Sequence, residues 1–133
     1  MEWTLRLDKS RVDITAVKKN QSPTFVYADP DLIEQVEEGV KRQILAYGPD
    51  LMAVKVWFEE GAIGYVHDHY HSQTSYVVSG EFEVMIDGQT QLLKAGDSFY
   101  VAPDLSHGAV CKKAGVLIDM FSPLREDFLN EKN

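Results

Sequence analysis

Three of the four histidines of this chain lie at alternate positions in one short segment, HDHYH, at residues 67–71. The fourth is His107. In a β-strand, residues i, i+2 and i+4 point to one face and lie roughly 6.5–7 Å apart. If a strand runs straight through the segment, the three imidazoles share a face, and two of them can lean onto one ion at bond lengths of about 2.1 Å. Neutral imidazole with an oxygen ligand suits borderline metals such as zinc, nickel, iron or manganese.

The residues around this cluster favour a metal site over chance. A histidine on a strand is more often a plain core or surface residue, and three on a solvated edge can form only a weak metal-binding face. Here, however, the first block reads G-x5-H-x-H-x3-Q-x6-G over residues 61–80. A second block carries Gly96, Pro103 and His107.

The two blocks together resemble the cupin superfamily, whose first motif carries two histidines and a glutamate and whose second carries one more histidine. The resemblance implies an all-β double-stranded β-helix, the jelly-roll barrel, with one divalent transition metal (zinc, nickel, iron or manganese) inside it. By position, it assigns as metal ligands His67, His69, Gln73 and His107.

Gln73 stands where the superfamily pattern has a glutamate. An amide removes one negative charge, which leaves a bound ion a stronger Lewis acid for an anionic substrate. The same change can instead weaken metal binding, so both outcomes stay open. For His71, which is outside the four ligands, three roles stay open: an outer-shell hydrogen bond, proton transfer, or a surface position.

The C-terminal segment carries a narrower resemblance. The stretches HSQTSYVVSGEFEVMIDG and VLIDMFSPLREDFL look like the KdgF-type cupins of pectin and alginate breakdown, which linearise 4,5-unsaturated uronates to 5-keto sugars. Their glutamine ligand matches Gln73, and their D-x-F-x3-R segment matches Asp119, Phe121 and Arg125. The alternative for this tail is a C-terminal strand that buries Phe121 in the core.

This resemblance implies a small anionic, sugar-like substrate, and the chemistry of opening it suggests roles for five side chains. We expect Asp119 to act as the catalytic base, with His71 as a proton shuttle. Arg125 is expected to bind the substrate carboxylate as a bidentate pair, and Phe121 and Tyr76 are expected to wall the pocket. Two other functions stay open, an Fe(II)-dependent dioxygenase and a non-catalytic metal- or sugar-binding cupin.

The net charge of the chain limits the classes of molecule that it can be expected to bind. With 21 acidic and 13 basic side chains the formal net charge is −8, which argues against a nucleic-acid partner because such proteins carry a basic face. An anionic substrate therefore needs local positive charge from a metal or an arginine. No run of about 18 apolar residues is present, so we expect no membrane span. A single cysteine and a charged N-terminus lead us to expect a cytoplasmic protein.

The elements that must position these residues are short strands separated by turns, from residue 40 onward. Asp87-Gly88 is a two-residue hairpin signal. This pattern of short strands separated by turns predicts an antiparallel sandwich or barrel. We expect strands at residues 40–47, 51–60, 74–80, 81–87, 89–94, 97–103, 107–112 and 115–121.

The N-terminal part of the chain is expected to form an extension over residues 1–39 that packs on a cupin domain at residues 40–129. Residues 22–27 read as a short edge strand. Residues 29–39 read as one or two helical turns, which Asp29 caps and Gly39 ends. Residues 51–58 are apolar on both faces, so we expect a second covering layer, from a homodimer partner or from the N-terminal segment.

Overall fold

The computed structural model describes residues 20–130. Its elements are almost all strands. In chain order they are η3 (Pro30–Leu32), β1 (Glu34–Glu37), β2 (Val40–Gly48), β3 (Leu51–Phe58), β4 (Ile63–His67), β5 (Ser72–Ile86), β6 (Gln89–Lys94), β7 (Ser98–Val101), β8 (His107–Ser122) and α2 (Glu126–Asn130).

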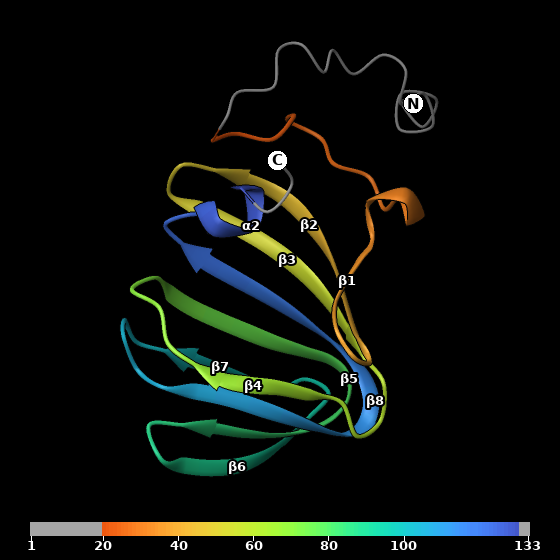
Figure 1. Ribbon diagram of the computed structural model, residues 1–133, viewed down its shortest axis with the longest axis vertical. Helices are drawn as coiled ribbons and strands as arrows, with labels where there is room; N and C mark the ends of the chain where they lie inside the picture. The colour runs from red at the N-terminus through yellow and green to blue at the C-terminus, as the bar shows by residue number, and fades with distance from the viewer. Residues whose placement is uncertain (1–19, 131–133) are drawn as a thin grey trace.

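Figure 1 shows the strands in two layers that meet where β5 and β8 bend. The first half of β5 and the second half of β8 pair with each other and belong to one layer, in the order β1-β2-β3-β8-β5-β7. Their other halves pair in the second layer, with β4 beside β8 and β6 beside β5. All pairs are antiparallel. The expected all-β jelly-roll architecture is confirmed.

Two glycines allow β5 and β8 to cross closely at this bend. Gly80 has a φ of 84°, which a side chain disfavours. A Cβ at Gly80 would also lie 2.5 Å from the carbonyl oxygen of Lys113. A Cβ at Gly115 would clash with the carbonyl oxygen of Ser79. Because neither position can carry a side chain without moving backbone, the corner between the layers depends on both glycines.

The space between the layers holds the core. On β5, Gln73, Ser75 and Val77 are buried while Thr74 and Tyr76 between them are exposed, the alternation of a strand with one face turned inward. Two apolar clusters fill most of this space. One is centred on β3 and the end of β8, and the other on β5 and the middle of β8.

Several expected elements have different bounds in the structure. The expected strands at 74–80 and 81–87 form the single strand β5, and those at 107–112 and 115–121 form β8. Gly80 and Gly115, which lie at the expected strand ends, are at bends beyond which the pairing of β5 and β8 resumes, with shifts in register around Gly80. The expected Asp87-Gly88 hairpin is confirmed, since both residues have positive φ and Ile86 pairs with Gln89.

The N-terminal expectations are only partly met. Asp29 caps a helix as expected, accepting a hydrogen bond from the Asp31 N–H, but the helix is a single 3-10 turn. Residues 34–37 form β1 instead of continuing it, because they pair with β2. Residues 22–27 form no strand. Residues 1–19 of the expected extension lie outside the described residues, and the boundary at residue 40 stays a prediction.

Among residues 20–130, no helix is long and apolar enough to cross a membrane.

Candidate metal centre and cavity

The structure brings three of the four histidines together at the edge of the second layer. His67 ends β4 and pairs with His107 at the start of β8, and His69 lies in the loop between β4 and β5. One ligand nitrogen from each lies within 4.8 Å of the other two. The ring centroids of His67 and His107 are 4.4 Å apart, and those of His69 and His107 are 4.8 Å apart.

Each of these three imidazoles is oriented by a backbone carbonyl two residues away. The Nδ1 atoms lie 2.8, 3.0 and 3.0 Å from the carbonyl oxygens, which belong to Tyr65, His71 and Leu105. A carbonyl oxygen can only accept, so each Nδ1 carries the proton. The Nε2 lone pairs are therefore left for another partner, and Nε2 of His107 is buried with no hydrogen-bond partner among the described residues. Metal-binding histidines are typically held in this way.

Gln73 adds an oxygen to the cluster. Its Oε1 lies 3.0 Å from Nε2 of His69, although the neutral ring offers only a lone pair there. Two lone pairs at this distance repel unless a positive charge lies between them. The four side chains therefore form a donor set that fits a cation, with three nitrogens and one oxygen, which suits a divalent transition metal.

Burial favours the neutral form of His69 and His107. Desolvation lowers the pKa of His107 to about 4. It also lowers the pKa of His69, and the positive charge of Arg125 acts in the same direction. Neutral imidazole is the form that binds a metal ion, so the site is ready for a cation at neutral pH.

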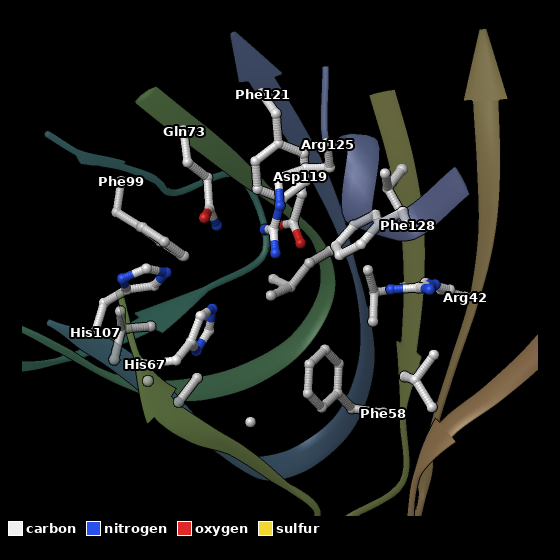
Figure 2. Close-up of a pocket in the computed structure, with 18 residues that line it drawn as sticks. Arg42, Phe58, His67, Gln73, Phe99, His107, Asp119, Phe121, Arg125 and Phe128 are labelled. Carbon is white, nitrogen blue, oxygen red and sulfur yellow. The ribbon is translucent and has the colours of Figure 1, made fainter. Parts of the chain in front are cut away.

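Beside the histidines lies a cavity of about 200 Å³ between the two layers. Figure 2 shows aromatic and aliphatic side chains around most of it, with His67, His107 and Gln73 on one side and Asp119 and Arg125 facing them. The polar side chains that reach the cavity are Arg42, His67, Gln73, His107, Asp119 and Arg125. A mostly apolar cavity with a few convergent polar groups is typical of a small-molecule site.

Asp119 lies on β8 between Val54 of β3 and Ser75 of β5. Its carboxylate accepts a 2.6 Å hydrogen bond from the hydroxyl of Ser75. Desolvation raises its pKa to about 6, although the Ser75 hydrogen bond and the charge of Arg125 oppose the increase. Asp119 is thus ionised at neutral pH and close enough to its pKa to accept and return a proton.

Arg125 is almost fully buried and belongs to a cluster of cations and rings. It donates to Asp127 through Nε at 3.0 Å and Nη2 at 2.8 Å. Its guanidinium carbon lies 4.1 Å from the ring centroid of Phe128, and that of Arg42 lies 3.9 Å from the same ring. Because Asp127 takes Nε and Nη2, the Nη1 side of the guanidinium remains for a ligand in the cavity.

The sequence of this chain is similar to known proteins, and this similarity shows its family. Residues 54–121 match the Cupin_2 family of cupin domains. The chain is 47% identical over 98 residues to the pectin degradation protein KdgF of Dickeya dadantii (strain 3937), covering 72% of this chain and 89% of that protein. The chain belongs to the cupin superfamily.

Two solved cupin structures are similar over most of their length. An RmlC-like cupin from Shewanella frigidimarina NCIMB 400 superposes with a TM-score of 0.79 at 56% identity, covering 82% of this chain and 98% of that one. KdgF from Halomonas sp. superposes with a TM-score of 0.75 at 43% identity, covering 79% and 99% respectively. The expected resemblance to KdgF-type cupins is therefore confirmed.

Most of the residues singled out from the sequence reach the site of this cupin. His67, Gln73 and His107 line the cavity together with Asp119, Phe121 and Arg125, and His69 contacts Gln73. Residues 68–71 form a loop, so the condition under which the three histidines would share one strand face is not met. The loop turns His69 back onto His107.

Two expected site residues lie elsewhere. Tyr76 points to the outer face of β5 and is 45% exposed, so the expectation that it walls the pocket is wrong: it alternates with the inward-facing Ser75 and Val77. His71 does not line the cavity. Its ring stacks on Tyr70 at 4.0 Å, and neither buried nitrogen has a hydrogen-bond partner among residues 20–130. The role of His71 as a shuttle stays a prediction.

Among the residues that the sequence did not single out, Arg42 and Phe128 line the cavity, and Ser75 contacts two lining residues, Gln73 and Asp119. Ser75 shares a strand face with Gln73, two residues away, and Arg42 shares a face with the apolar Val40 and Ile44. Both alternations were visible in the sequence. Phe128 had no such signal, because it reaches the cavity only through the turn that precedes α2.

Proposed function

We propose that this cupin binds one divalent transition metal and opens 4,5-unsaturated uronates to 5-keto sugars. The observation that carries the proposal is one small cavity that combines a cluster of three histidines, a buried carboxylate and a buried arginine. The chain's similarity to two KdgF proteins, one of which is named for pectin degradation, supports a uronate as substrate. The proposed metal ligands are His67, His69, Gln73 and His107.

The size and charge of the cavity fit a monosaccharide acid. Pockets for drug-sized ligands span roughly 300–1,000 Å³, and this one measures about 200 Å³. Two arginines line the cavity, Arg42 paired with Glu34 and Arg125 paired with Asp127, and the Nη1 side of Arg125 is left for an anionic group. A single anionic sugar thus fits better than a chain of sugars.

The proposed reaction is an isomerisation. Asp119 takes the proton of the C1 hydroxyl, the C1–O5 bond breaks, and C1 becomes an aldehyde. The electron pair stays on O5, as an enolate of the C4=C5 bond. A proton returned by Asp119 to C4 leaves a ketone at C5, so substrate and product have the same atoms.

The surrounding side chains hold this substrate in place. Arg125 binds the C6 carboxylate through its Nη1 side, a charge-assisted contact that fixes orientation. Phe121 and Phe99 line the cavity and exclude water from the enolate. When bound, the metal ion supplies positive charge for the oxygen on which negative charge develops. His71 has no step in this proposal, because its ring does not line the cavity.

An anaerobic assay tests the proposed reaction class. Purified protein and a 4,5-unsaturated uronate monomer are incubated without oxygen, and loss of the C4=C5 ultraviolet absorbance is followed. We expect turnover at the aerobic rate, with one 5-keto product per substrate. Turnover only with Fe(II) and with oxygen uptake would replace the proposal by a dioxygenase. Bound but unchanged uronate would replace it by a sugar-binding cupin.

A further inference from the structure

A chain of three polar contacts, two of them hydrogen bonds, connects the histidine cluster to Asp119. Nε2 of His69 lies 3.0 Å from Oε1 of Gln73. Nε2 of Gln73 donates to the hydroxyl of Ser75 at 2.9 Å, and that hydroxyl donates to Asp119 Oδ1 at 2.6 Å. Ser75 is 1% exposed, so water does not replace either of its partners.

The direction of this chain follows from what each group can donate. A carboxylate only accepts, so the single proton of the Ser75 hydroxyl is used on Asp119. The oxygen of Ser75 then has only lone pairs for Gln73. The amide of Gln73 must meet it with its NH₂ group, which turns Oε1 toward His69 and the other histidines. The reversed amide would place two acceptors face to face beside Ser75.

This direction matters because a glutamine has two unlike ends. A carboxylate presents the same oxygen to a cation whichever way it rotates about its last bond. An amide offers either a carbonyl oxygen, which binds a cation, or an NH₂ group, which repels it. A glutamine at a metal-binding position therefore needs a neighbour that selects one rotation.

We propose that Ser75 is a positioning residue that holds the carbonyl oxygen of Gln73 toward the three histidines and so makes an amide usable as a metal ligand. The inference rests on the metal site of the proposed function, but it makes no use of the uronate. Ser75 also holds Asp119 through the same hydroxyl. One side chain thereby orients the oxygen ligand and the proposed base together.

A double-mutant cycle on metal affinity tests this role. Zinc affinity is measured by competition with a chromophoric chelator, at pH 7.5, for the natural chain, Ser75→Ala, Gln73→Glu and the double variant. Changes in residues behind metal ligands typically cost roughly 10–100-fold in affinity, and we expect Ser75→Ala to weaken zinc binding by that factor. In the Gln73→Glu background we expect less than about a threefold effect, because a carboxylate needs no orientation.

Two further variants separate positioning from packing. Ser75→Thr keeps the hydroxyl, so we expect zinc affinity near that of the natural chain. Thr74→Ala removes a neighbouring hydroxyl from the exposed face of β5 and should leave zinc affinity unchanged. Thermal unfolding in the presence of chelator shows that each variant is folded before its affinity is compared.

The outcomes are distinct. Loss of zinc affinity by the same factor in the glutamine and glutamate backgrounds would show that Ser75 acts through packing alone, and would overturn this inference while the metal site stands. An unchanged affinity in Ser75→Ala would overturn it as well. A natural chain that binds no zinc, nickel, iron or manganese would overturn the proposed function and this inference together.

Discussion

Asp119 is an acid whose surroundings oppose its ionisation. It lies in a mostly apolar cavity, and desolvation raises its pKa from the ordinary 3.8 to about 6. The folded chain therefore holds this proton more tightly than the unfolded chain does. Ionised Asp119 destabilises the fold, by an amount that grows as the pH rises from about 4 to about 6 and is complete above that range. Because the ionised carboxylate of Asp119 destabilises the fold, we expect it to have a role in catalysis.

Replacing Asp119 by asparagine should separate activity from stability. We expect Asp119→Asn to lower turnover of the uronate by at least roughly 100-fold, because general-base catalysis contributes about 10²–10⁴-fold. Metal content should be unchanged. In the presence of chelator, the variant should unfold at a higher temperature than the natural chain at pH 7.5 but at a similar temperature at pH 4. A lower unfolding temperature at pH 7.5 would contradict the assigned cost of ionisation.

Arg125 is expected to contribute to binding rather than to turnover. A hydrogen bond to a charged group is worth about 1.5–3 kcal/mol, and each tenfold change in affinity corresponds to about 1.4 kcal/mol. Arg125→Ala should thus raise the Michaelis constant of the uronate roughly 10- to 100-fold. A steady-state comparison with Arg11→Ala, outside the described residues, controls for the loss of one positive charge. An unchanged Michaelis constant would exclude Arg125 from substrate binding.

The sequence predicts the residues of the site better than it predicts their neighbours. The spacing of His67, His69, Gln73 and His107 identifies a candidate donor set because the cupin pattern is specific. Tyr76 was misplaced because an isolated aromatic residue does not reveal which strand face is buried. Ser75 and Arg42 were missed because a serine or an arginine on a strand usually faces solvent. Their roles follow only from tertiary contacts, which join Ser75 to Asp119 and Arg42 to Phe128.

At the scale of elements, the bends in β5 and β8 decide which residues face the cavity. The two strands pair on both sides of the bend, so their first and second halves contribute to different layers. This continuity could not be predicted from the sequence, where a glycine reads equally well as a strand end and as a bend. The hairpin at Asp87-Gly88 was predictable because both of its residues must have positive φ.

Replacing Gly80 should therefore disrupt the corner. Gly80→Ala places a Cβ 2.5 Å from the Lys113 carbonyl oxygen at a φ of 84°, and we expect a loss of at least roughly 1–3 kcal/mol in the free energy of unfolding. Gly48→Ala is the matched control, since nothing lies within 4 Å of its added Cβ. Chemical denaturation of both variants measures the difference. Equal stability would show that the corner tolerates a side chain.

At the scale of the whole molecule, an apolar outer face remains without a cover among the described residues. Tyr76, Tyr100 and Met120 are each more than a third exposed. They lie on neighbouring strands β5, β7 and β8, and Ala53 of β3 pairs with Met120 to continue the row. Monomers rarely expose contiguous apolar patches of more than a few hundred Å². The second face of residues 51–58, for which the sequence predicts a cover, belongs to this surface.

We propose that a second copy of the chain covers this face. Light scattering at micromolar concentration should give the mass of a dimer for the natural chain and that of a monomer for Tyr76→Glu. Leu92→Glu, which changes an exposed apolar residue on β6, should remain dimeric. A monomeric natural chain would count against the dimer and leave residues 1–19 as the expected cover.

The central claim is that this molecule opens an unsaturated uronate with the help of a metal held by its histidines. The most direct test is the turnover of a 4,5-unsaturated uronate monomer before treatment with a chelator, after it, and after re-addition of zinc, nickel, iron or manganese. We predict that the chelator abolishes turnover, that at least one of these metals restores it, and that His107→Ala stays inactive throughout. Full turnover by metal-free protein, or by His107→Ala, would contradict the claim.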